Sequence, residues 1–185
     1  MKNGYYIKTI ENAPEGARPM LSQVQDNLGF VPNGLAAMAN SPVVLSAFLQ
    51  LGGLLPQTSF TDTERHVLYL AVTREYDSEY CVSAHTAFAH MDKVDDKIVQ
   101  QLREGQQIDD ERLEALRQFA IRLVQTGCNV DEEEVKRFLK YGYSREQVLE
   151  IVLIIAHKIF GVFTNRIMGT DLDEALQPLK WSKVA

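Results

Sequence analysis

The residues of this sequence that could carry chemistry gather in the stretch DSEYCVSAHTAFAHM (77–91), which holds one of the two cysteines and two of the four histidines. On a helix, residues three or four positions apart share a face, so Ser78, Cys81 and His85 would line up over two turns. A histidine one turn from a thiol can take its proton, and the positive end of the helix dipole favours the thiolate. Such neighbours lower a cysteine pKa from about 8.5 by roughly one to several units. The pattern therefore predicts a nucleophilic thiolate at Cys81.

Two other interpretations of the same stretch are open. Free cysteine often packs as a small hydrophobe, and a helical histidine is often a hydrogen-bonded core residue. Alternatively, Cys81, His85 and His66 could bind a divalent ion through sulfur and nitrogen. The second cysteine of a C-x2-C knuckle, which usually accompanies structural zinc, is missing. We therefore expect neither a bound metal nor a cofactor.

The elements that must position these residues are helical. Apolar residues recur at helical spacing from about residue 19, whereas bounded runs of strict two-residue alternation are missing. The chain is long and apolar enough for one domain with a sizeable core. We predict an irregular arm over 1–18 and a single all-α domain over 19–185, with the candidate site in its core segment 61–91. The expected helices are two short ones around the loop 29–34, then 41–55, 61–72, one beginning near 78, 95–104, 109–126, 131–141 and 144–168.

Capping residues fix where the helices beside the cysteine begin. Thr61 and Glu64 have the spacing of a capping box, and Asp77 or Ser78 is the expected N-cap of the next helix. The last helix, 144–168, is apolar on nearly every face. Such a helix lies at the centre of a fold or contributes to an oligomer interface.

Composition excludes several function classes. The formal net charge of -6 comes from scattered residues without a basic block, so nucleic acid is not an expected partner. The most apolar segment, 148–163, is interrupted by Glu150, His157 and Lys158 and is too short and too polar for a continuous membrane span. No secretory signal is visible. We expect a cytoplasmic protein with no membrane partner and two free thiols. Cys128 is expected to be a packed loop cysteine rather than a resolving one.

The segment TERHVLYLAVTREYDSEYCVSAHTAFA (63–89) resembles the core of the carboxymuconolactone decarboxylase family, in its alkylhydroperoxidase-like (AhpD-like) branch. The flanking segments 28–51 and 151–181 resemble the peroxidase-related members. The resemblance implies an all-α fold, a homo-oligomer such as a trimer or hexamer, and a thiol-based hydroperoxide reductase.

The family motif reads C-x-x-C-x-x-x-H, with Cys81 at its second cysteine and His85 at its histidine. Ser78 stands where the first cysteine would be, and serine cannot resolve a sulfenic acid. The position of the family's acidic proton-relay residue falls on His66, with Glu64 two residues earlier, and either could serve as the relay. The region of Asn165 and Arg166 carries polar residues near the site in relatives.

Three functions are compatible with these residues. The first is a one-cysteine peroxidase in which His85 deprotonates Cys81 and an external thiol reduces the sulfenic acid. The second is a lyase or isomerase that uses His85 and His66 on a small lactone or organic acid. The third is a non-enzymatic oligomer that keeps the scaffold. We favour the first because the cysteine and histidine pair survives.

Overall fold

The computed structural model describes residues 2–183, and within that range the regular structure is helical, with no strand. The predicted all-α fold is confirmed. The α-helices are α1 (Arg18–Leu28), α2 (Asn33–Met38), α3 (Pro42–Leu54), α4 (Asp62–Glu75), α5 (Glu79–Met91), α6 (Asp96–Glu104), α7 (Glu111–Thr126), α8 (Glu132–Leu139) and α9 (Arg145–Met168). Three short 3-10 helices are η1 (Glu15–Ala17), η2 (Leu55–Gln57) and η3 (Glu174–Leu179).

The N-terminal arm packs onto the domain. Residues 2–14 contain no helix, and α1 begins at Arg18, one residue before the expected boundary. Ala13 and Ala17 are buried in a small apolar cluster with Leu21, Leu45 and other residues of the first helices and α9. The arm therefore closes one end of the fold.

The helices beside Cys81 begin where their capping residues predict. The Thr61 side chain accepts from the Glu64 N–H while Glu64 binds back to the N-cap, so the capping box of α4 is confirmed. The Ser78 side chain caps α5 by accepting from the Cys81 N–H at 3.4 Å. Between these helices Asp77 has a φ of 47°, a left-handed conformation that asparagine and aspartate tolerate better than most residues. The sharp connection places α5 against α4.

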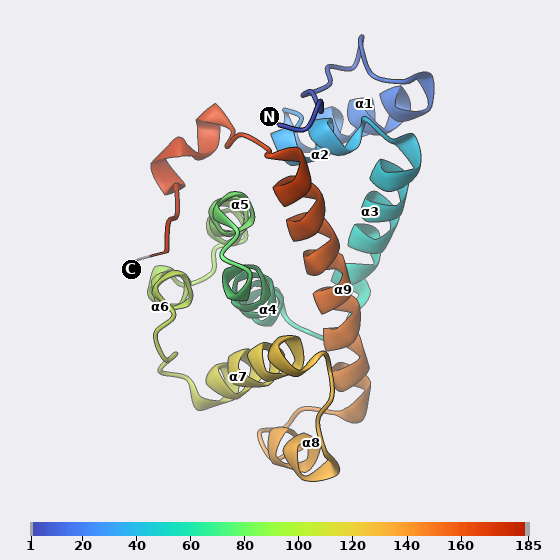
Figure 1. The fold of residues 1–185 in the computed structure, drawn as a ribbon. Coiled ribbons are helices and arrows are strands. Elements are labelled where there is room, and N and C mark those ends of the chain that lie inside the picture. The colour runs from blue at the N-terminus through green and yellow to red at the C-terminus, as the bar shows by residue number, and fades with distance from the viewer. Residues whose placement is uncertain (1, 184–185) are drawn as a thin grey trace.

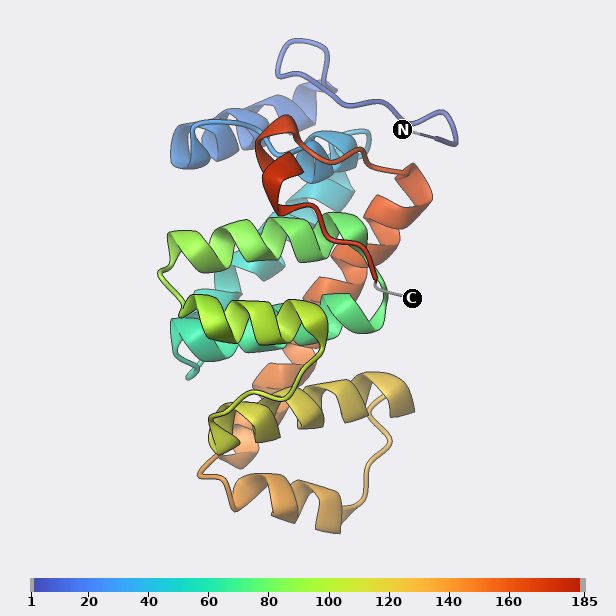
Figure 2. The ribbon, with the colours of Figure 1, turned by 90° about the vertical axis from the view of Figure 1, so that its left-hand side faces the viewer.

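Helix α4 lies at the centre of the main core, between α5, α6, α7 and α9 (Figure 1). Figure 2 shows α5, α4 and α7 as successive layers, with α9 running across them. Fully buried residues such as Leu68 and Leu70 of α4, Leu116 of α7 and Ile154 of α9 fill the space between the layers. Helices far apart in sequence thereby come to share one core.

Helix α9 has the central place that its apolar sequence predicts. Its most apolar 18-residue window has a mean hydropathy of 1.7, which by length and composition alone would suffice to cross a membrane, and 44% of that window is buried inside the protein. One side packs on α2, α3, α4, α5 and α7. The other side exposes large apolar residues, namely Leu149, Val152, Phe163 and Ile167.

Candidate functional site

A cavity of about 450 Å³ lies between α5, α9 and the N-terminal helices. This is within the range of about 300–1,000 Å³ that is typical of small-molecule sites. Its wall is mainly apolar, with aromatic residues such as Phe48 and Phe88. Among the polar groups in the wall are the side chains of Cys81, His85 and Lys158. A small molecule in this cavity would therefore meet the thiol in apolar surroundings.

Cys81 is a free thiol near the start of α5, and only 6% of its surface is exposed. The Nδ2 group of Asn165, on α9, donates to its Sγ at 3.7 Å. Burial raises the pKa of the Cys81 thiol, and the side chains of Ser78, Asn165, Lys158 and Arg166 oppose that effect without overcoming it. The prediction that the helix terminus and His85 would lower this pKa is wrong for the resting site, because the cost of desolvating a thiolate is larger.

His85 contacts a lysine that the sequence analysis did not assign to the site. Its Nε2 lies 3.3 Å from Nζ of Lys158, which also sits over the ring of Tyr69 at 4.0 Å. Burial lowers the pKa of Lys158 to about 7, whereas a charge on Cys81 acts in the opposite direction. Burial, and next the charge of Lys158, lower the pKa of His85 well below its usual value. His85 is therefore a neutral imidazole at neutral pH.

Lys158 is exposed to only 5% and has no carboxylate partner within residues 2–183, which is rare for a lysine. The sequence carried a weak signal for it, since His157 and Lys158 are adjacent polar residues inside an apolar run. His157 is also buried in the cavity wall, where it stacks on Phe48 with ring centroids 4.2 Å apart. Burial lowers the pKa of His157 to about 3, so this histidine too is neutral at neutral pH.

His66 lies one ring away from the cavity. Its Nε2 is 2.7 Å from Oδ2 of Asp92, whose side chain is 53% exposed. The ring of Tyr69 stands between the two histidines, 5.4 Å from the centroid of His66 and 5.1 Å from that of His85. The Nδ1 atoms of both histidines are buried without a hydrogen-bond partner in the described part of the chain. His66 thus lies outside the cavity wall, with the ring of Tyr69 between it and His85.

Glu64 and Ser78 stabilise helix ends outside the cavity. The Glu64 side chain is 4% exposed and pairs with Arg112 of α7 in addition to capping α4. Ser78 caps α5. Of the five predicted site residues, all within the described range, only Cys81 and His85 line the cavity.

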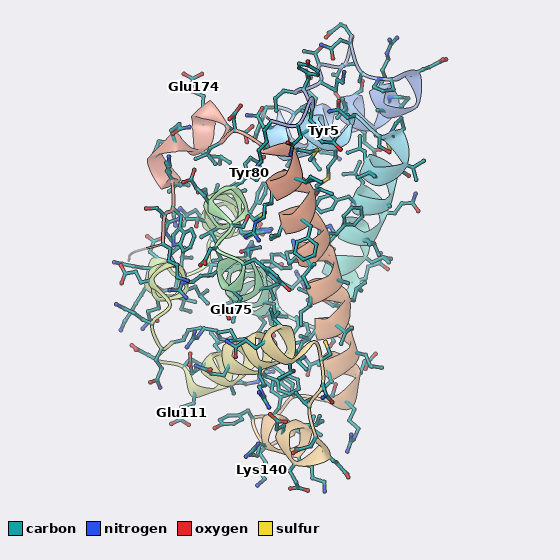
Figure 3. All side chains as sticks on the ribbon, viewed as in Figure 1. Tyr5, Glu75, Tyr80, Glu111, Lys140 and Glu174 are labelled. Carbon is teal, nitrogen blue, oxygen red and sulfur yellow. The ribbon has the colours of Figure 1, made fainter. Side chains whose placement is uncertain are left out.

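The wall formed by the C-terminal segment depends on Tyr80. Its hydroxyl accepts from the Gly34 N–H at 2.7 Å and donates to Oδ2 of Asp173 at 2.9 Å. The other oxygen of Asp173 accepts from the Asn33 N–H at 2.8 Å. Figure 3 shows Tyr80 between α5 and the C-terminal end of α9. No local pattern in the sequence marks this cluster, because its members are 46 and 93 positions apart.

The second cysteine, Cys128, does not have the packed position that the sequence predicts. Cys128 is exposed and has a φ of 64°, so it is not a packed loop residue. Within residues 2–183, no three histidine, cysteine, aspartate or glutamate side chains are grouped so that they could hold a metal ion.

No protein-family model and no curated protein matches this sequence. Solved structures do match it. The crystal structure of an alkylhydroperoxidase AhpD core, an uncharacterized peroxidase-related protein from Ralstonia eutropha, superposes with a TM-score of 0.84 at 23% identity over 93% of both chains. The chain has the AhpD-like fold.

Two further structures share the AhpD-like fold. An uncharacterized peroxidase-related protein from a Silicibacter species superposes with a TM-score of 0.74 at 19% identity, over 93% of this chain and 92% of that one. The debrominase Bmp8, in a cysteine-to-alanine variant bound to 2,3,4-tribromopyrrole, superposes with a TM-score of 0.81 at 24% identity, over 97% of this chain and 96% of that one. At these identities the comparisons establish the fold, which is the one that the sequence resemblance implied.

Proposed function

We propose that this chain is a thiol-dependent reductase of a small organic hydroperoxide, with Cys81 as the nucleophile. The observation that carries the proposal is a free cysteine in the wall of an apolar cavity, where the amide of Asn165 donates to its Sγ and where the hydrogen-bonded side chains of His85 and Lys158 line the same wall. The peroxidase-related structures with the AhpD-like fold support the same class of chemistry.

The reaction consumes one thiol and one peroxide in its first step. The Cys81 thiolate attacks the terminal oxygen of the hydroperoxide, the O–O bond breaks, and the departing alkoxide takes up a proton to become an alcohol. Cys81 is left as a sulfenic acid. An external thiol then forms a mixed disulfide with release of water, and a second one restores the Cys81 thiol. Ser78 has no sulfur to replace the external thiol.

The cavity favours a substrate with an apolar body. Its wall contains no carboxylate and no guanidinium from the described residues, and Lys158 is its one aliphatic amine. Burying a charged group without a partner is costly, so an alkyl or aryl hydroperoxide fits this wall better than a multiply charged one. The volume of about 450 Å³ accommodates a molecule of the size of cumene hydroperoxide.

We assign His66 to proton exchange with solvent, because it contacts the half-exposed Asp92 on one side and the Tyr69 ring on the other. Asp92→Asn tests the assignment. It should lower peroxide turnover while leaving alkylation of Cys81 unchanged, and equal turnover in both proteins would contradict the assignment. We assign Glu64 to stability, since Arg112 and the N-cap of α4 occupy its carboxylate.

A second candidate is reductive dehalogenation of a small aromatic halide. The specific observation is the likeness to the debrominase Bmp8, which was solved with 2,3,4-tribromopyrrole after its cysteine was changed to alanine. In such a reaction the thiolate would bind the halogen, the carbon–halogen bond would break, and the carbon would take up a proton. One external thiol would then displace the halide and form a mixed disulfide with Cys81, and a second would restore the Cys81 thiol.

One experiment separates the candidates. Reduced protein in a Cys128→Ala background is treated with cumene hydroperoxide or with 2,3,4-tribromopyrrole, each with excess dithiothreitol, and product formation is followed. We expect alcohol from the peroxide, a sulfenic-acid label on Cys81 by mass spectrometry when reductant is omitted, and loss of both in Cys81→Ala. Debromination without peroxide reduction would favour the second candidate. An unlabelled Cys81 and no turnover of either compound would refute the thiol-based function.

We also propose that the chain forms a homo-oligomer, a trimer or a hexamer, in the cytoplasm. The exposed apolar side of α9, formed by Leu149, Val152, Phe163 and Ile167, supports an interface there. Light scattering after size-exclusion chromatography tests it. A monomeric mass at micromolar concentration would contradict the proposal, and Val152→Lys should lower the mass of an oligomer.

A further inference from the structure

Lys158 has an unusual environment for a charged group. Its side chain is buried in the cavity wall and forms no ion pair with a carboxylate within residues 2–183. Its contacts are Nε2 of His85 at 3.3 Å and the face of the Tyr69 ring at 4.0 Å. A buried ammonium needs a nearby anion, and without one the group loses its proton.

The cavity offers one protein group that can become that anion. Cys81 lines the same wall, and the charges of Cys81 and Lys158 act on one another. The other acidic groups of the wall are the hydroxyls of Tyr69 and Tyr80, and burial raises the pKa of both, that of Tyr69 to about 12. Among the described residues of the wall, the Cys81 thiolate is therefore the counter-ion available to Lys158.

We infer that Lys158, and not His85, is the acid–base partner of Cys81: its amine accepts the thiol proton and its ammonium returns that proton to the substrate. The second half of this inference rests on the proposed function, whereas the first half concerns the resting site. Lys158 would thus take the role that the sequence motif suggests for His85.

The remaining groups around Lys158 agree with this assignment. From α5 it faces Cys81 and His85, from α4 the ring of Tyr69, behind which His66 lies, and from α9 its neighbour His157. The described groups that face it thus include no carboxylate, and α3 contributes the uncharged ring of Phe48 beside His157.

In the inferred step, the neutral amine of Lys158 takes the proton of Cys81 and becomes an ammonium beside the thiolate. The thiolate then attacks the terminal peroxide oxygen, the O–O bond breaks, and the ammonium protonates the alkoxide. The amine is restored, Cys81 is a sulfenic acid, and one alcohol has formed. His85 is a positioning residue here, since its Nε2 lies at hydrogen-bond distance from Nζ of Lys158.

The test is the pH dependence of Cys81 alkylation by iodoacetamide between pH 5.5 and 9.5, in a Cys128→Ala background so that one thiol reports. The variants are Lys158→Met, which keeps the length and apolar stem, Lys158→Arg, which keeps the charge, and His85→Asn. Lys140→Met, at an exposed lysine directly after α8, is the matched control. Circular dichroism and urea unfolding establish that each variant folds.

The inferred Lys158–Cys81 pair predicts a different pH profile of Cys81 alkylation for each variant. The unmodified site should show a rise in alkylation with an inflection near pH 7, where Lys158 gains its neutral form. In Lys158→Met the rate at pH 7 should fall at least about tenfold, with the inflection above about pH 8.5, the ordinary thiol value. His85→Asn and Lys140→Met should keep the inflection to within about half a unit. Lys158→Arg should keep fast alkylation but lose at least about tenfold in peroxide turnover, because arginine is not deprotonated in proteins.

Overlapping profiles of Lys158→Met and the parent would overturn the inference. So would an inflection that moves in His85→Asn as far as in Lys158→Met. Alkylation that depends on Lys158 in a protein that reduces no peroxide would instead refute the proposed function and leave the proton partnership in place. Undiminished turnover in Lys158→Arg would overturn the acid role alone.

Discussion

Replacing Tyr80 by phenylalanine removes one hydroxyl that holds the cavity wall together. Tyr80 stands directly before Cys81 at the start of α5, and its hydroxyl joins α2 to the segment that carries η3. The ring itself stays in place in the variant. The change therefore isolates the two hydrogen bonds from the packing of the ring.

The expected loss of stability follows from what each partner retains. Asp173 keeps the Asn33 N–H, whereas the Gly34 N–H loses the acceptor that it had at 2.7 Å. A hydrogen bond to a charged group contributes about 1.5–3 kcal/mol, and a buried donor left without a partner costs about 1–3 kcal/mol. We expect Tyr80→Phe to lower the free energy of unfolding by about 3 kcal/mol, or the melting temperature by about 6–12 °C in a domain of this size.

Urea unfolding monitored by circular dichroism measures the loss, with Tyr141→Phe as the matched control at a tyrosine that is 46% exposed. Alkylation of Cys81 gives a local readout, and it should become faster as the wall loosens. A loss of less than about 0.5 kcal/mol together with unchanged alkylation would refute the reasoning. That result would mean that the hydroxyl gains no more from Gly34 and Asp173 than from water in the unfolded chain.

Three further outcomes are expected. Ser78→Cys should create a C-x-x-C pair that closes to a disulfide on oxidation, seen as a loss of two hydrogens by mass spectrometry; a variant that still reacts at Cys81 with alkylating agent after oxidation would contradict this. Glu64→Gln should lower the free energy of unfolding by about 1–3 kcal/mol, because it weakens the charge pair between the buried Glu64 and the half-exposed Arg112. The alkylation profile of Cys81 should stay the same, and a changed profile would indicate that Glu64 acts in the site. Finally, folding lowers the pKa of Lys158 to about 7, so between pH 7 and 8.5 this lysine keeps its proton in the unfolded chain and loses it in the native protein. The free energy of unfolding should therefore rise over this pH range by up to about 2 kcal/mol. Lys158→Met should remove that rise in urea titrations, and an equal rise in both proteins would contradict the assignment.

Much of the fold is visible in the sequence because helix signals are local. Thr61 and Ser78 cap α4 and α5 where the sequence predicts, and the absence of alternating patterns excluded a sheet. The packing of the N-terminal arm onto the domain was not visible in the sequence. Ala13 and Ala17 are small residues whose burial depends on helices that follow much later in the chain.

The sequence by itself determined that Cys81 and His85 share one face of a helix, since an interval of four residues sets that geometry wherever the helix packs. Only the tertiary structure decided their protonation. It buried the thiol, placed Lys158 from a helix 73 positions further along the chain against His85, and left Glu64 and Ser78 outside the cavity. The physical reason is that a pKa depends on desolvation and on charges within a few ångströms, and both are fixed by which helices pack together rather than by spacing along one of them.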